Sequence, residues 1–293
     1  MRSRGYGWLL ALAALLALAG AWRWHRATDS NASAVSDAAG AITVAGGDGG
    51  GLPRVDAAAE GFERQPLELA QAWAAAQHAR ALLLVRHGHL VGEQYDGMDA
   101  ATLVEGGELA HAVLQLSAGV ASAQYGLAEP PAAQPDDMQL AAAIATASHR
   151  SYAQFLSRNL WQPLNAAAAL WSPVDMRARS GDWLRVAELL LHDGRFEGTQ
   201  VVPSGWAQRL PHPRAALGAE PFADGTMYVL RGRGATRLWL SPRFDLALLC
   251  VADAGEAPAL AADETRLPNM VIRALRDRPG VSGTGLNDLV PGH

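Results

Sequence analysis

Apolar and polar positions along the chain separate into extended runs and helical repeats. Two strand-like runs, 81–86 and 89–95, are separated only by His87-Gly88, and an X-Gly pair between extended runs predicts a hairpin. Helical spacing of apolar residues predicts helices over 67–79, 108–125, 137–147, 152–160, 182–192, 203–210 and 261–276. Further strands are expected over 227–230, 236–240 and 245–252. This order predicts an α+β fold, an antiparallel β-sheet flanked by helices.

The two ends of the chain differ from this patterned part. Residues 1–26 hold Arg2, Arg4, an uncharged Leu/Ala run and a Trp/Arg flank, which predicts a membrane anchor or a cleaved signal peptide. Residues 27–66 are rich in Ala, Gly, Ser and Asp and predict a flexible linker. The folded domain is expected over 67–278, followed by a tail over 279–293. We expect this domain in the periplasm, either anchored to the inner membrane or exported.

Composition removes several classes of function. A net charge of −5 over 293 residues offers no basic surface for nucleic acid. A single cysteine, Cys250, excludes an internal disulfide and a thiolate zinc site, and its apolar strand predicts a buried thiol. All 24 cationic side chains are arginine, so chemistry that needs a lysine is excluded.

Four segments resemble the serine β-lactamase and penicillin-binding protein-like family, in its class C-related branch. The hairpin ALLLVRHGHLVGEQYDG resembles the opening strand pair, and SYAQFLSRNLWQPLN resembles a helix that leads into a turn. SGDWLRVAELLLHDGRFEGTQVVPSGW resembles the helix and turn that follow, and GRGATRLWLSPRFDLALLCVAD resembles the last two strands. The resemblance implies a β-lactamase/transpeptidase-like sandwich. Because only 126–151 bridge the motif helix and the next resembling helix, the helical subdomain is expected to be largely deleted.

The three motifs that carry the chemistry of that family are absent. In register, the Ser-x-x-Lys motif falls on Glu108 to His111, and the Lys-Thr-Gly or His-x-Gly motif falls on Arg233-Gly234-Ala235. No tyrosine has an asparagine two residues later, so Tyr-x-Asn is missing as well. Glu108, His111 and Arg233 therefore match the site positions of the family, but no catalytic residue, cofactor or metal is assigned.

Three functions are compatible with these observations. The first is a degenerate member of the family, a non-catalytic envelope protein that binds a partner or a cell-wall fragment. The second is a residual β-lactamase or esterase-type hydrolase that uses Glu108 and His111, which share one helix face at i and i+3. The third is a histidine phosphatase that uses Arg86-His87-Gly88, which requires the histidine at the end of a strand facing a cleft.

Overall fold

The computed structural model describes residues 40–128, 137–207 and 227–277. Contacts divide the chain into two units, Met1–Ile42 and Thr43–His293, and the second unit contains both hydrophobic cores. Within the described ranges, no helix combines the length and the apolar character needed to cross a membrane. The anchor or signal peptide expected over 1–26 and the tail over 279–293 lie outside the described residues.

A five-stranded antiparallel sheet forms the centre of this unit, with the order β3-β2-β11-β10-β9. Its strands are β2 (Ala81–Arg86), β3 (His89–Tyr95), β9 (Tyr228–Arg231), β10 (Arg237–Ser241) and β11 (Leu246–Val251). Side chains of β2 alternate between two cores: Leu82 and Leu84 enter one and Leu83 and Val85 the other. Both faces are therefore buried, which explains the continuous apolar runs. The predicted hairpin and its antiparallel pairing with the C-terminal strands are confirmed.

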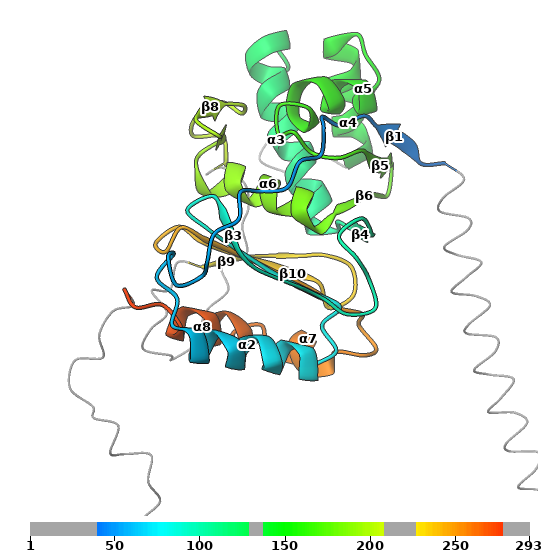
Figure 1. The fold of residues 1–293 in the computed structure, drawn as a ribbon. Coiled ribbons are helices and arrows are strands. Elements are labelled where there is room, and N and C mark those ends of the chain that lie inside the picture. Colours follow the sequence, from blue (N-terminus) through cyan, green and yellow to red (C-terminus); the bar gives the residue numbers. More distant parts are fainter. Residues whose placement is uncertain (1–39, 129–136, 208–226, 278–293) are drawn as a thin grey trace, which may run out of the picture. The chain divides into compact units, whose positions relative to one another are not determined.

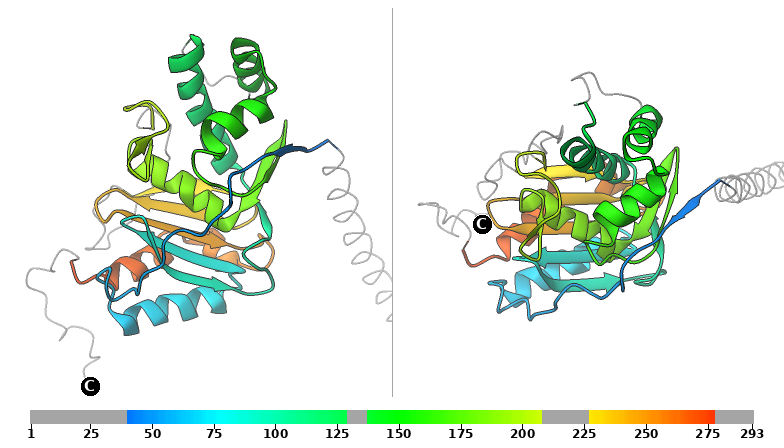
Figure 2. Two further views of the ribbon diagram at one scale, coloured as in Figure 1. Left: turned by 45° about the horizontal axis from the view of Figure 1, so that its top comes forward. Right: turned by 90° about the horizontal axis from the view of Figure 1, so that it is seen from above.

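Helices cover both faces of this sheet (Figures 1 and 2). One face packs against α2 (Arg64–Ala76), α7 (Pro258–Ala262) and α8 (Arg266–Arg273). The other face packs against α6 (Ser180–Leu191), and beyond it lie α3 (Glu108–Tyr125), α4 (Asp137–Ser148) and α5 (Tyr152–Leu156). The α+β fold, an antiparallel sheet flanked by helices, is confirmed.

The helices agree with the predicted ranges to different degrees. Helix α3 has the bounds that the periodicity predicts, and Gly126 ends it in the left-handed conformation. The helix expected over 152–160 changes after α5 into a π-helical turn, η1 (Ser157–Trp161). The helix expected over 261–276 is two helices, α7 and α8. For the predicted helix over 203–210, the described residues 203–207 contain turns and no α-helix, and residues 208–210 lie outside the described residues.

A second sheet was not predicted from the sequence. It has the order β1-β5-β6-β4, with β1 (Ile42–Val44), β4 (Leu103–Glu105), β5 (Ala169–Ser172) and β6 (Asp175–Arg179). A small hairpin, β7 (Arg195–Phe196) and β8 (Thr199–Gln200), follows α6. These strands have two to five residues, too few for a clear alternation of apolar and polar positions.

The prediction of a flexible linker over 27–66 is wrong for 43–66, which we call the N-terminal segment. Its few large apolar side chains are buried: Val44 is fully buried, Phe62 is 1% exposed and Leu52 is 7% exposed. The Gly46 backbone lies so close to Ala166 that a Cβ would stand 2.2 Å from the Ala166 carbonyl oxygen. The glycines here allow close packing, and the domain begins before Leu67. Residues 27–39 lie outside the described residues.

The bridge between α3 and α5 is short. Helix α4 is the one helix that the described part of this bridge holds, and residues 129–136 lie outside the described range. This agrees with the expectation that the helical subdomain is largely deleted.

Candidate functional site

Two glycines place the start of α3 against the edge of the central sheet. A Cβ at Gly106 would stand 2.8 Å from the Trp183 ring, and one at Gly107 would stand 2.9 Å from the Arg231 carbonyl oxygen. Gly107 also has a φ of 54°, which side chains other than glycine rarely adopt. The tight approach brings the first residue of α3, Glu108, beside β9.

Both the backbone and the side chain of Arg231 contact the Glu108 carboxylate. The Arg231 backbone N–H donates to Glu108 Oε2 at 2.8 Å, and the Arg231 guanidinium lies 3.9 Å from Oε1. Glu264 in turn accepts hydrogen bonds from Arg231 and Arg237 at 2.6 to 2.8 Å. Although burial opposes it, the pair of arginines lowers the pKa of Glu264, and Glu264 raises the pKa of Arg231. Glu108 thus belongs to an ion-pair network that joins α3 to the sheet edge.

His111, one turn further along α3, faces a different partner. Its Nδ1 lies 2.6 Å from Asp137 Oδ1 at the start of α4, and its Nε2 lies 3.4 Å from the Gln115 side-chain amide. The described contacts of Glu108 and His111 therefore lead in separate directions. Sequence reasoning missed Asp137, whose position as the first residue of a separate helix gave no sign of this contact.

Arg233 lies beside the start of α3, in the turn between β9 and β10. Its Nε is 3.6 Å from Asp175 Oδ2 and 3.7 Å from Glu105 Oε2. Asp175 Oδ1 accepts the Gly107 backbone N–H at 3.0 Å, so Asp175 links the arginine to the helix start. The structure thus places Glu108 and Arg233 at the same helix terminus.

A groove of about 410 Å³ opens beside this cluster. Three arginines line it from separate elements: Arg80 before β2, Arg177 on β6, and Arg233. The acidic lining residues are Glu105 and Asp253, and Asp175 beside the groove also pairs with Arg233, so the three arginines meet three carboxylates. The guanidinium groups are donors to which a ligand carboxylate can bind.

The two other sequence candidates do not form sites. His87 and Gly88 are the turn residues of an antiparallel hairpin, and both have positive φ. The buried Arg86 guanidinium donates hydrogen bonds to Asp277 and to two backbone carbonyl oxygens. The antiparallel pairing and the engaged Arg86 argue against the histidine phosphatase hypothesis. Cys250 is fully buried, and burial raises the pKa of its thiol to about 12, so it stays protonated.

The described residues contain no group of three His, Cys, Asp or Glu side chains that could hold a metal ion. One buried hydroxyl pair that the sequence did not suggest is Ser117 with Tyr152, 3.3 Å apart. Both side chains are in the core, and Ser117 Oγ donates to the Val113 carbonyl oxygen, so this pair is structural.

Solved structures with the same fold identify its architecture. A candidate 6-aminohexanoate-dimer hydrolase from Bacillus anthracis matches with a TM-score of 0.56 and 13% identity, over 80% of this chain and 92% of the other. A candidate β-lactamase from Bacteroides dorei matches at 0.54 and 10%, over 72% and 99%. A β-lactamase from Mycobacterium bovis matches at 0.51 and 13%, over 71% and 100%. No protein-family model and no curated protein matches the chain. The chain has the fold of β-lactamase and penicillin-binding protein-like serine hydrolases.

Proposed function

We propose that this protein is a non-catalytic member of the cell envelope, built on a β-lactamase-like fold, that binds a partner or a cell-wall fragment. The observation that carries the proposal is the state of the nucleophile position. The register of the sequence resemblance aligns Glu108 with that position, and its carboxylate accepts the Arg231 backbone N–H. Acyl transfer in this family needs a hydroxyl nucleophile with a positioned base, and this position holds a carboxylate that takes part in an ion-pair network instead.

The groups that would support acyl transfer are replaced as well. The chain has no lysine to act as the activating amine. His111 occupies that position, and its Nδ1 faces Asp137 rather than Glu108. Because preorganised proton transfer and charge stabilisation supply most of the rate of such an enzyme, their loss removes the reaction.

The arginine groove supports a binding role. A cell-wall peptide carries carboxylates, and Arg177 and Arg233 line the groove beside the start of α3. The anchor or signal-like character of residues 1–26 supports a location in the periplasm, either membrane-anchored or exported.

Covalent labelling tests the loss of catalysis. The full-length protein is incubated with a β-lactam and with a fluorophosphonate, and its intact mass is measured. We expect no adduct and no turnover of nitrocefin or short-chain esters. A covalent adduct of the protein with either reagent would overturn the non-catalytic assignment.

A binding assay tests the groove. Soluble cell-wall peptides that carry a free carboxylate are titrated against the protein and against Arg233→Gln, Arg177→Gln and the control Arg158→Gln, which removes an exposed arginine that is not part of the groove lining. Weaker binding in the two groove variants alone supports the proposal. Equal binding in all three variants would contradict it.

The second candidate is a residual hydrolase, and one observation favours it. The His111–Asp137 contact at 2.6 Å has the form of a carboxylate that orients an imidazole for general-base work. Turnover that is lost in both Glu108→Gln and His111→Ala would establish this function in place of the first.

A further inference from the structure

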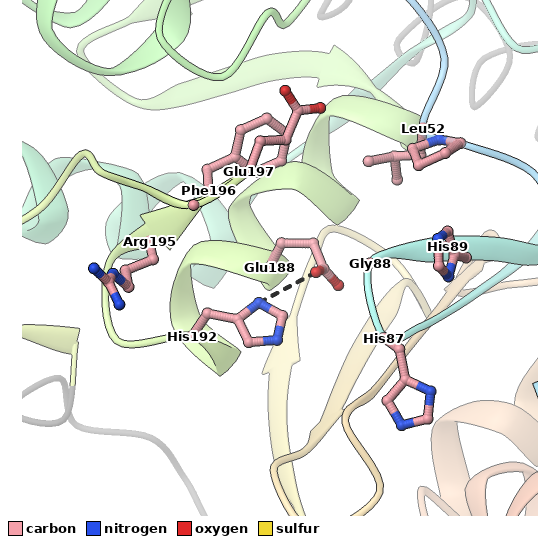
Figure 3. A pocket seen from close by; sticks show the side chains of 11 residues that line it. Leu52, His87, Gly88, His89, Glu188, His192, Arg195, Phe196 and Glu197 are labelled. Carbon is pink, nitrogen blue, oxygen red and sulfur yellow. Dashed lines mark ion pairs between the residues drawn. The ribbon is translucent and has the colours of Figure 1, made fainter.

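A second cavity, of about 430 Å³, shares no lining residue with the arginine groove. It lies between the β2–β3 turn, the C-terminal end of α6 and the β7–β8 hairpin (Figure 3). Leu52, Pro53 and Phe196 supply apolar walls, and two glycines, Gly88 and Gly198, open its sides. The volume is in the range of small-molecule sites.

A buried carboxylate lines this cavity beside the apolar walls. The side chain of Glu188 is 5% exposed, and its carboxylate lies between His192 and Gly88 (Figure 3). Its Oε2 is 3.3 Å from His192 Nδ1. Its Oε1 has no hydrogen-bond partner among the described residues. An unpaired buried acceptor of this kind costs free energy unless a ligand or water supplies a donor.

The charged groups around the Glu188 carboxylate favour a cationic ligand. His192 bridges two carboxylates, with its Nε2 2.9 Å from Asp245 Oδ1. Hydrogen bonds with Asp245 and Glu188 raise the pKa of His192 to about 10, so it is charged at neutral pH. One imidazolium between two carboxylates leaves one negative charge within this trio, and His87 and Arg86 also attract Asp245. His87 and His89, which line the cavity as well, pair with Glu60. At the rim, the charges of Arg195 and Glu197 oppose each other.

We infer that this cavity binds a small amine with an apolar body, whose ammonium group pairs with the Glu188 carboxylate while Leu52 and Phe196 enclose the rest. The site is separate from Glu108, Arg233 and the groove, so it does not depend on the proposed function.

Three ligands that share one ring test the charge preference. Cyclohexylamine, cyclohexanol and cyclohexanecarboxylate are each titrated into the full-length protein at pH 7 by isothermal titration calorimetry. We expect saturable binding of the amine only. Equal binding of the alcohol would overturn the amine assignment, and no binding of the amine would show that the cavity holds water alone.

Two glutamate-to-glutamine variants distinguish the effect of the buried Glu188 carboxylate from a general electrostatic attraction. Glu188→Gln keeps the shape but removes the charge, and we expect it to weaken amine binding roughly 10- to 100-fold. Glu256→Gln removes an exposed charge that lies outside the lining of the cavity and is expected to leave binding unchanged. An equal loss in both variants would contradict the role of Glu188. Circular dichroism of Glu188→Gln verifies that the variant is folded, and a folded variant with wild-type affinity would also overturn the inference.

Discussion

Several charged side chains in this protein are partly buried, and the chemical role open to each depends on its ion-pair and hydrogen-bond partners. Glu108 shows this most clearly, since its carboxylate, which the sequence resemblance aligns with a nucleophile position, accepts the Arg231 backbone N–H. Its i+3 neighbour His111 pairs with a residue of another helix, Asp137. Two residues on one helix face thus serve two different contacts, and spacing alone does not make them a pair.

His192 gives a prediction at the residue scale about pH. Its ordinary pKa is 6.5, and contacts with Asp245 and Glu188 raise the pKa to about 10 in the folded protein. The ion pairs of protonated His192 contribute their full stabilisation below about pH 6.5, and this contribution is lost as the pH rises through about 10. We expect the free energy of unfolding to fall between pH 7 and 10, and to fall less in His192→Gln. Urea titrations over this range measure it. The groups that face His192 are Glu188, Asp245 and, near Asp245, His87.

The control for this prediction is His78→Asn. His78 is exposed and has a positive φ of 58°, a conformation that asparagine tolerates. This variant should keep the pH dependence of the wild type. If His192→Gln keeps it as well, the ion pairs of His192 do not contribute to stability.

A buried ion pair gives a second residue-scale prediction. Asp182 and Arg185 are 2% and 5% exposed, with Asp182 Oδ1 2.9 Å from Arg185 Nη1. Burial raises the pKa of Asp182, against the hydrogen bond from Ala167 and the attraction of Arg185. Removing one partner leaves an unpaired buried charge, so we expect Asp182→Ala to lower the free energy of unfolding by about 3–5 kcal/mol.

The double variant checks the cause. Asp182→Ala combined with Arg185→Met removes both charges, and we expect it to lose less stability than the two single variants added together. Additive losses in a urea-denaturation cycle would show that the two side chains act independently.

At the scale of elements, close backbone contacts fix how the pieces meet. The N-terminal segment lies against the end of η1 through Gly46 and Gly47, and the Gly47 N–H donates to the Ala166 carbonyl oxygen at 2.8 Å. The start of α3 uses Gly106 and Gly107 against its neighbours in the same way. Small residues at these points determine the positions of whole elements.

Gly46→Ala tests the tightest of these contacts. The added Cβ would meet the Ala166 carbonyl oxygen at 2.2 Å, so backbone must move, and we expect a loss of about 1–3 kcal/mol in the free energy of unfolding. Gly51→Ala is the matched control, because a Cβ there has no neighbour within 4 Å. Equal stability of the two variants in urea would contradict the close packing of this segment.

The central sheet could be predicted from the sequence because its strands are long and apolar. β2 and β11 are buried on both faces, so each gives an unbroken run, and His87-Gly88 marks the turn between β2 and β3. The second sheet could not be predicted, since a strand such as β4 has three residues.

The site was predictable in part. A family resemblance predicted that Glu108 and Arg233 lie near one helix end, whereas the contacts of His111 with Asp137 and of His192 with Asp245 join distant parts of the chain. Asp137 and Asp245 are ordinary surface-type residues in the sequence, and only tertiary packing brings them to their imidazoles.

At the scale of the whole folded unit, the N-terminal segment completes both cores. Val44 and Leu52 enter one core, and Phe62 enters the other. We expect a chain that begins at Leu67 to lose cooperative thermal unfolding, while one that begins at Thr43 keeps it, because buried apolar surface would become exposed. Circular dichroism melts of the two truncations measure this. Identical melting temperatures would show that residues 43–66 are dispensable.

The same segment imposes an order on folding. The Ala45 carbonyl oxygen accepts a hydrogen bond from the Ser157 hydroxyl, 112 residues later, and the Asp48 backbone N–H donates to Asn165 Oδ1, 117 residues later. As the chain emerges from the ribosome or an export channel, residues 43–51 appear early but have no surface to dock on until η1 has formed. Such long-range contacts are slow to close, so the first part of the domain to be synthesised is among the last to reach its native place. Until then, its unpaired backbone and the uncovered core around Leu164 are open to proteases and to chaperones.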